Sequence, residues 1–151
     1  MKNKINIKVV NSINKFKAKD WDNCNKNGNV FLSYNFLKLL EDSNSIGGNT
    51  GWQPIYFCLK VDDKITAVVP SFIKYHSQGE FVFDHSWAQA YQSLGINYYP
   101  KLLIASPFSP VTGKRILVTP NLNDNIKKKL FDFIKDFCKD KQISSIHINF
   151  I

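Results

Sequence analysis

The fold is decided by residues 54–76, PIYFCLKVDDKITAVVPSFIKYH. Two β-rich runs, 54–61 and 65–76, flank the short turn VDDK at 61–64, so they are close enough to pair as an antiparallel hairpin. Pro70 lies inside the second run and has no backbone N–H, which indicates an edge position, a bulge or a break in that strand. A sheet that grows outward from this hairpin is therefore the central prediction.

The residues on either side of the hairpin show strand patterns and helix patterns in turn. In the longest helical segment, Ile126, Leu130 and Ile134 recur at helical spacing, with lysines and aspartates on the other face. The other patterns predict strands at 5–10, 79–84, 101–108 and 143–150, and helices at 17–24, 33–44, 85–95 and 121–140. The order predicts an α/β protein of the α+β kind, with a mixed, mostly antiparallel sheet and helices on both faces.

Length and composition favour one folded domain. The chain has 151 residues, of which 44% are hydrophobic and 14% aromatic, a content too high for a disordered chain. The last predicted strand runs into the end of the sequence without a turn or cap. We therefore expect the sheet to be incomplete at its carboxy-terminal end, with the missing cover supplied by further polypeptide or another chain.

The charge and the cysteines restrict the classes of function. The net charge of +8 comes almost wholly from lysine, because Arg115 is the only arginine. This composition argues against sequence-specific recognition of nucleic acid, for which arginine is better suited. Generic attraction to polyanions stays open. Cys24, Cys58 and Cys138 follow no metal-ligand spacing, so no metal site is predicted. No apolar run is long enough to be an integral membrane segment and no secretory signal is found, so we expect a cytoplasmic protein with reduced thiols.

The densest chemistry lies between residues 75 and 115. No GxSxG, Walker, HExxH or GxGxxG signature is present. The aromatic residues here follow no clean period, so they either line a binding cleft or pack loops onto the sheet: Trp87, Tyr91, Tyr98, Tyr99 and Phe108. The loop 106–115, SPFSPVTGKR, brings hydroxyls, Lys114 and Arg115 together and could hold a phosphate or a carboxylate.

Two carboxylates lie in the same stretch. Glu80 and Asp84 are four residues apart in the predicted strand 79–84, so both can point to one side of the sheet. A carboxylate beside an aromatic wall is a suitable general base for an attacking amine. The alternative is that one or both are solvated residues at a sheet edge.

Four stretches of the sequence carry a resemblance to a known family. They are FLSYNFLKLLEDSNSIGGNTGWQP at 31–54, PSFIKYHSQGEFVFDHSWAQAY at 70–91, INYYPKLLIASPFSPVTGKRILV at 96–118 and SSIHINF at 144–150. Together they resemble the amino-terminal half of the bacterial FemAB-like proteins of peptidoglycan biosynthesis or recognition, within the GNAT-type acyltransferase fold. The resemblance covers about residues 20–151. It implies that 1–151 is a single GNAT-like domain, a fragment whose carboxy-terminal half, with an SRKRK-type segment, is missing from this sequence.

The resemblance also implies an activity. It implies acyl or aminoacyl transfer to a small-molecule or peptide amine, such as a peptidoglycan precursor, with acyl-CoA or aminoacyl-tRNA as donor for the full-length protein and tRNA as a partner. The loop R/Q-x-x-G-x-G/A is absent after the strand 101–106, so we expect no cofactor in this part. By analogy with the fold, strands 101–106 and 144–150 splay apart and expose backbone N–H donors.

These implications give a set of candidate site residues. Asp84 is the first choice for the catalytic base and Glu80 the second, while the substrate-binding candidates are Trp87, Tyr98, Tyr99, Lys101, Phe108 and Thr112. Two other functions stay open: a non-catalytic module that recognises a cell-wall precursor or peptide, and a lysine-driven polyanion binder.

Overall fold

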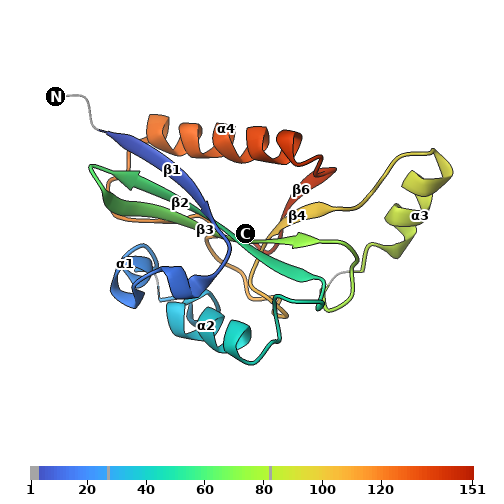
Figure 1. Cartoon of the computed structure of the whole chain (residues 1–151), viewed down its shortest axis with the longest axis horizontal. Helices are drawn as coiled ribbons and strands as arrows, with labels where there is room; N and C mark the ends of the chain where they lie inside the picture. The colour runs from blue at the N-terminus through green and yellow to red at the C-terminus, as the bar shows by residue number, and fades with distance from the viewer. Residues whose placement is uncertain (1–3, 27, 82) are drawn as a thin grey trace.

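The computed structural model describes residues 4–26, 28–81 and 83–151, and over these residues it has one six-stranded sheet (Figure 1). The strands follow the order β1-β2-β3-β4-β6, with β5 paired to β3 beside β4. β4 and β6 are parallel and the other pairs are antiparallel, which confirms the predicted mixed, mostly antiparallel sheet. The strand bounds are β1 (Ile5–Val10), β2 (Trp52–Val61), β3 (Lys64–Lys74), β4 (Lys101–Ile104), β5 (Leu117–Val118) and β6 (Ser145–Ile148).

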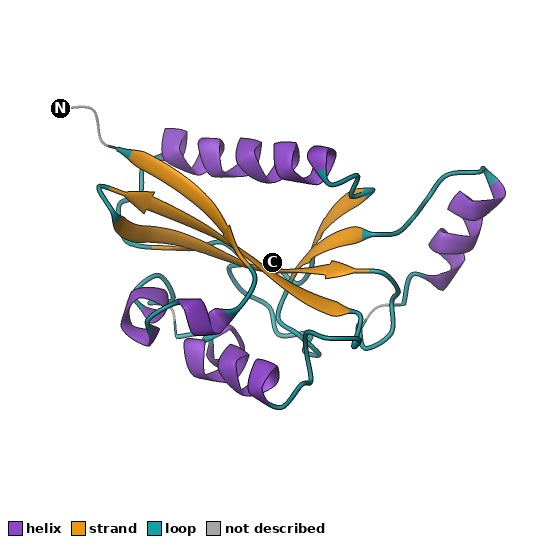
Figure 2. Ribbon diagram, in the orientation of Figure 1, coloured by secondary structure: helices purple, strands orange, loops and turns teal. Residues whose placement is uncertain are grey.

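Helices cover both faces of the sheet, as predicted (Figure 2). α4 (Asp124–Asp140) lies along one face, and α1 (Ala18–Asp22) and α2 (Tyr34–Asp42) lie on the other. α3 (His85–Ser93) projects beyond the end of the sheet, and none of its residues is buried. Two short 3-10 helices, η1 (Ile13–Lys15) and η2 (Val30–Leu32), complete the layer of α1 and α2. Within the described residues, no helix combines the length and the apolar character that crossing a membrane requires.

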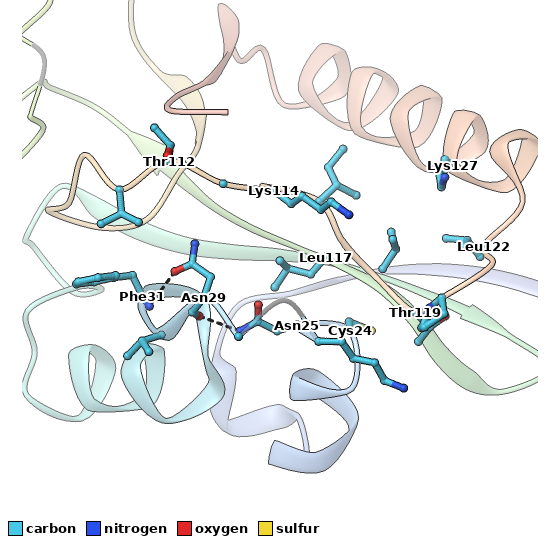
Figure 3. Close-up of a pocket in the computed structure, with 18 of the residues that line it drawn as sticks. Cys24, Asn25, Asn29, Phe31, Thr112, Lys114, Leu117, Thr119, Leu122 and Lys127 are labelled. Carbon is cyan, nitrogen blue, oxygen red and sulfur yellow. Dashed lines mark hydrogen bonds between the residues drawn. The ribbon is translucent and has the colours of Figure 1, made fainter.

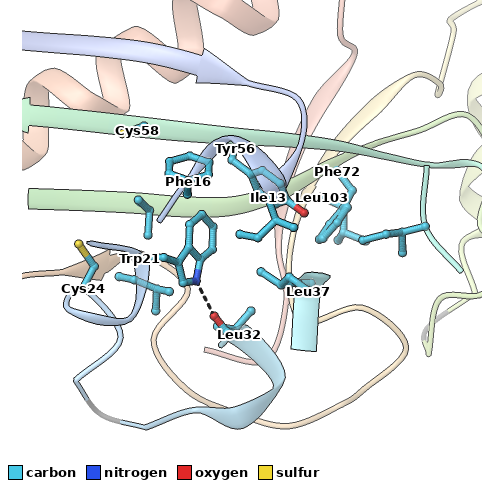
Figure 4. Packing of buried hydrophobic residues seen from close by; sticks show 14 of the residues in the cluster. Ile13, Phe16, Trp21, Cys24, Leu32, Leu37, Tyr56, Cys58, Phe72 and Leu103 are labelled. Carbon is cyan, nitrogen blue, oxygen red and sulfur yellow. Dashed lines mark hydrogen bonds between the residues drawn. The ribbon is translucent and has the colours of Figure 1, made fainter. Parts of the chain in front are cut away.

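Both faces of the central hairpin are buried, which explains why its sequence is almost continuously apolar. Successive side chains of a strand point to opposite faces, so Tyr56 and Phe72 pack with Trp21 under α1 and α2, as Figure 4 shows. Phe57 and Val69 pack on the other face against α4. The indole Nε1 of Trp21 donates to the carbonyl oxygen of Leu32 at 2.9 Å and so fixes η2 over this core.

The hairpin forms in the predicted place. Asp62 and Asp63 adopt positive φ angles of 49° and 62°, the left-handed conformation that a tight turn between twisted strands requires. Pro70 pairs with Tyr56 on one side, while on the other side β3 pairs with β5 at 67–68 and with β4 at 72–74. Pro70 therefore lies in the gap between two short neighbours, where its missing N–H leaves no ladder hydrogen bond unmade.

The strand predicted at 79–84 is wrong. The described residues 79–81 and 83–84 form a loop, and residue 82 lies outside the described part. β4 takes the place beside β3 that this strand needed, and Asp84 directly precedes α3. The apolar run at 81–83 is typical of a strand, but the side chains of Phe81 and Phe83 are exposed. The helices predicted at 17–24, 33–44, 85–95 and 121–140 are confirmed, with slightly shorter bounds.

A half-buried carboxylate ties the helical layer to the sheet. Glu41 of α2 accepts hydrogen bonds from the Ile13 backbone N–H at 2.8 Å, the Ser12 hydroxyl at 2.6 Å and the Tyr56 hydroxyl at 2.8 Å. Tyr56 is fully buried, and this burial, with the negative charge of Glu41 beside it, raises the pKa of its hydroxyl well above the usual range. The three bonds join η1, α2 and β2 through one side chain.

Replacing Glu41 should therefore destabilise the whole fold. We expect Glu41→Ala to lower the free energy of unfolding by about 3 kcal/mol, because it leaves the Tyr56 hydroxyl and the Ile13 N–H without partners, and Glu41→Gln to cost less. Urea denaturation followed by circular dichroism measures both. Asp42→Ala, which removes the adjacent carboxylate and its exposed ion pair with Lys38, is the matched control and should have no measurable effect. Equal midpoints for the Glu41 and Asp42 variants would contradict this role.

Candidate active site

A buried lysine gathers the chemistry at one end of the sheet. Lys101, the first residue of β4, is 1% exposed, and its ammonium group lies 2.9 Å from Glu80 Oε2. The same Nζ also bonds Asp84 Oδ2, which in turn accepts from the Tyr98 hydroxyl at 2.9 Å. The rings of Tyr98 and Tyr99 lie 5.8 Å from the ammonium group. One cation thus holds two carboxylates from the irregular segment between β3 and α3.

Several groups in and beside this cluster have shifted pKa values. Burial raises the pKa of Glu80, and the bond to Lys101 opposes that rise only in part. Burial, followed by the hydrogen bond to Asp84, raises the pKa of the Tyr98 hydroxyl. Burial also lowers the pKa of His147 on β6, and Lys101 adds to that lowering. Glu80 is therefore the carboxylate in this cluster whose proton affinity is raised toward the range of a useful base.

A second lysine is buried next to the first. Lys74, the last residue of β3, is the register partner of Lys101 and is fully buried. Its ammonium group lies 4.0 Å from the centre of the Trp52 ring and donates to the Gln78 carbonyl oxygen at 2.9 Å. Burial lowers the pKa of Lys74 to about 8, with Glu80 opposing and Lys101 adding to the shift. Two ammonium groups and two carboxylates thus share this end of the sheet.

A small hollow opens where β4 and β6 end. It is lined by Trp52, Glu80, Phe81, Leu103, Ala105, Ser106, Phe108, Ser109, Asn149 and Phe150, and its volume of about 10 Å³ suits one water molecule or one amine group. Three buried polar atoms on its lining residues have no hydrogen-bond partner among the described residues: Glu80 Oε1, Trp52 Nε1 and Ser106 Oγ. The set offers a carboxylate acceptor, an N–H donor and a hydroxyl that does either.

Gly79 keeps this hollow open. Its φ of +76° belongs to the left-handed region, and a Cβ at this position would come within 2.8 Å of Trp52 Nε1 and 3.2 Å of Phe108. The rings of Trp52 and Phe108 themselves lie 4.9 Å apart. The free space beside the indole N–H therefore depends on a residue without a side chain.

The predicted site residues fall into three places. Tyr98, Tyr99 and Lys101 join Glu80 and Asp84 in the buried cluster, and Phe108 lines the hollow. Trp87 lies on α3 with 65% of its surface exposed and lines neither cavity. Thr112 lines a separate, larger groove (Figure 3). Asp84 accepts the bonds from Lys101 and Tyr98 at Oδ2, and Glu80 Oε1 is the buried carboxylate oxygen of this cluster that has no partner among the described residues.

In the 106–115 loop, for which an anion-binding role is expected, Arg115 makes bonds within the chain and keeps one buried donor, Nη1, without a partner among the described residues. This side chain is 2% exposed, its Nε donates to the Asn149 carbonyl oxygen at 2.8 Å, and its Nη2 donates to the Val111 carbonyl oxygen. The guanidinium group therefore fastens the loop to the end of β6. Lys114 next to it is exposed at the groove.

The sequence analysis missed Lys74, Trp52 and Ser106. A single lysine among the apolar residues of a predicted inner strand is a usable signal for a buried charge, and Lys74 has it. Trp52 and Ser106 come together only through the tertiary fold, and no local pattern marks either. Within the described ranges, no group of three or more histidine, cysteine or acidic side chains lies close enough together to hold a metal ion.

Sequence comparison gives the family. A sequence model of FemAB-like proteins, described as peptidoglycan biosynthesis/recognition, matches residues 12–151. The chain belongs to the FemAB-like family. No curated protein matches it.

The FemAB-like chain has the fold of GNAT-type acyltransferases. It is similar to the solved structure of an aminoglycoside N-acetyltransferase, AAC(6')-Iy, in complex with coenzyme A, with a TM-score of 0.57 and 12% sequence identity. The match covers 99% of this chain and 78% of that one. At this identity the likeness concerns the fold, and it confirms the GNAT-like arrangement expected from the sequence.

The strand ends of the FemAB-like domain do not suit the long pantetheine arm of coenzyme A. β4 and β6 stay in register from Lys101 and Ser145 to Ile104 and Ile148, and the Asn149 N–H then bonds the Ile104 carbonyl oxygen at 3.2 Å. The expected splay of 101–106 from 144–150 is therefore limited to the residues beyond this bond. The hollow there has room for one small polar group only.

The depressed pKa of Lys74 predicts a pH-dependent contribution of this lysine to stability. Between pH 8 and pH 10.5 the unfolded chain keeps the proton that folded Lys74 has released, so the free energy of unfolding of the wild type should increase relative to that of Lys74→Met through this window. The buried thiols of Cys24, Cys58 and Cys138, whose pKa values burial raises, lower the stability of both proteins alike. Lys74→Met should stabilise the domain at pH 7 by about 2–3 kcal/mol. Urea titrations of both proteins from pH 7 to pH 10.5 measure the difference, with exposed Lys64→Met as control. Parallel curves for the wild type and Lys74→Met would contradict the assignment.

Proposed function

We propose that this FemAB-like domain binds the primary amine of an acyl acceptor, a peptidoglycan precursor peptide, and removes a proton from that amine during acyl transfer. The observation that carries this proposal is the unpartnered, buried Glu80 Oε1 at the hollow beyond β4 and β6. An amine placed there donates hydrogen bonds to Glu80 Oε1 and to Ser106 Oγ, and its lone pair accepts one from Trp52 Nε1. In the reaction this lone pair then attacks the acyl carbon.

The surroundings of the hollow suit an alkyl chain that leads to this amine. Phe81, Phe108 and Phe150 line the hollow, and the rings of Phe81 and Phe150 lie 6.0 Å apart. Methylene groups packed among these rings gain from the removal of apolar surface from water. We infer that the acceptor is the side-chain amine of a diamino acid within the peptide.

The chemical step uses Glu80 as a base. Lys101 holds Oε2 at 2.9 Å and so orients the carboxylate with Oε1 toward the hollow. As the amine nitrogen forms a bond to the acyl carbon and the bond to the leaving group breaks, the amine proton passes to Oε1. The burial that raises the pKa of Glu80 makes this carboxylate a stronger proton acceptor than an exposed one. The acyl donor, an aminoacyl ester or a thioester, is held outside the described strand ends.

We further propose that residues 1–151 form a single domain of a longer two-half protein that acts in the bacterial cytoplasm. The resemblance of this chain to the first half of FemAB-like proteins supports the proposal. In this arrangement the second half contributes to donor binding, and tRNA is a partner only when the donor is an aminoacyl ester.

The exposed aromatic surface of α3 favours a second candidate, recognition of a peptide without catalysis. Phe83 and Trp87 are 64% and 65% exposed, and Leu94 and Ile96 continue the apolar surface past the helix. Contiguous exposed apolar side chains of this kind are typical of a contact surface.

The test is transfer of labelled acyl groups from acetyl-CoA or aminoacyl-tRNA to a lysine-containing or diaminopimelate-containing precursor peptide by the full-length protein. We expect Glu80→Gln to reduce the rate constant of transfer at least 100-fold, because a positioned base contributes about 10²–10⁴ in rate. Exposed Asp136→Asn, which makes the equivalent change on α4, should keep the wild-type rate. Full activity of Glu80→Gln would remove Glu80 from the reaction, and peptide binding without transfer from any donor would favour the recognition function.

A further inference from the structure

A cavity much larger than the hollow lies away from the candidate active site (Figure 3). It is a groove of about 860 Å³ between the segment that joins α1 to η2 and the loop before α4. Cavities of about 300–1,000 Å³ are the usual size for small-molecule ligands. None of the candidate base and ring residues of the hollow lines this groove.

A pair of amide groups on one wall has a defined polarity. Asn25 is 7% exposed, and its Nδ2 donates to the Asn29 carbonyl oxygen at 2.9 Å, while its Oδ1 has no partner among the described residues. Asn29 Oδ1 accepts from the Phe31 N–H at 3.1 Å, and these bonds identify the oxygen and nitrogen of both amides. In Figure 3 the Asn25 oxygen and the Asn29 nitrogen both point toward the loop that carries Thr112 and Lys114. The wall thus directs one acceptor and one donor toward this loop.

The remaining lining is cationic and apolar. Lys26 and Lys114 are exposed at the groove, and Lys127 lies at its other end with Asp124 2.8 Å away. Among the described lining residues none is acidic. Apolar side chains line both sides of the groove: Val30, Phe31, Ile116, Leu117, Val118 and Leu122.

Gly113 leaves the space beside the amide pair free. A Cβ at this position would come within 3.3 Å of Asn29 Nδ2, and the Gly113 N–H is already used by the Phe150 carbonyl oxygen at 3.0 Å. Together with the Arg115 bonds, this fastens the loop that forms one wall of the groove to the end of β6.

We propose that this groove binds a nucleotide. Every nucleobase has an edge with an N–H donor beside an acceptor, which matches Asn25 Oδ1 and Asn29 Nδ2. A flat ring packs between the two apolar walls, and the phosphates lie against Lys26 and Lys114. The site is separate from the hollow, and its existence does not depend on the proposed transfer reaction.

The experiment is calorimetric titration of the full chain with ADP, CDP, GDP and UDP, and separately with inorganic pyrophosphate, at about 150 mM salt. We expect at least one nucleoside diphosphate to bind at least tenfold more tightly than pyrophosphate. Asn29→Asp keeps the oxygen that caps η2 but replaces the donor by an acceptor, so it should weaken that nucleotide about tenfold more than it weakens pyrophosphate. Asn35→Asp, an exposed change of the same kind on α2, is the matched control and should leave both unchanged.

Lysine variants and nuclear magnetic resonance locate the site. Lys114→Ala should weaken the nucleotide several-fold and make its binding less dependent on salt, whereas exposed Lys17→Ala should have little effect. Amide shifts on titration should concentrate in residues 24–31 and 111–122. Equal affinity for nucleotides and pyrophosphate would indicate mere polyanion attraction and would overturn the proposal, as would the absence of nucleotide binding at millimolar concentration.

Discussion

The burial of Lys101 is the constraint on which the end of this sheet depends. An ammonium group that is 1% exposed is stable only with close negative partners, and the chain supplies Glu80 and Asp84. Both carboxylates come from the segment between β3 and α3, which has no strand to pair with. The ion pairs therefore place this segment over the start of β4. The ion pairs hold this irregular segment in position, as ladder hydrogen bonds hold a strand in a sheet.

The same constraint creates the reactive feature of the molecule. Lys101 bonds one oxygen of Glu80, and the other oxygen, Oε1, is buried without a partner among the described residues. A buried polar atom without a partner costs about 1–3 kcal/mol. Three such atoms on the lining of a space that suits one small polar group are satisfied together when an amine or a water molecule occupies it. The free-energy cost of these unpartnered atoms thus favours binding of a small polar group that can bond all three.

Much of the fold could be predicted because periodicity reports burial. The hairpin at 54–76 and the helix α4 have apolar residues wherever the core requires them, and both formed as predicted. The segment 79–84 shows the limit of this reasoning. Its apolar run at 81–83 is typical of a strand, but Phe81 and Phe83 are exposed, and β4 pairs with β3 in the place that such a strand would take.

The site shows the same limit at the level of single residues. The period of two predicts Glu80 and Asp84 on one face of a strand, whereas they meet because both bond Lys101. Trp87, predicted as part of an aromatic wall, lies exposed on α3. Trp52 is remote from Glu80 in the sequence, so nothing local could have joined them. The residues of this site are brought together by their contacts with buried charges, and no sequence motif marks them.

The hollow and the groove share one wall. Ser106, Phe108 and Ser109 line the hollow, and the same loop continues through Val111, Thr112 and Gly113 along the groove. Bonds from Arg115 to the Asn149 carbonyl oxygen and from Gly113 to the Phe150 carbonyl oxygen fasten this loop to the end of β6. The buried guanidinium group therefore determines the shape of both cavities without contributing to the chemistry of either. The only arginine of a lysine-rich chain is found here because its planar group donates in two directions at once, to Asn149 and to Val111, which a lysine ammonium cannot match in geometry.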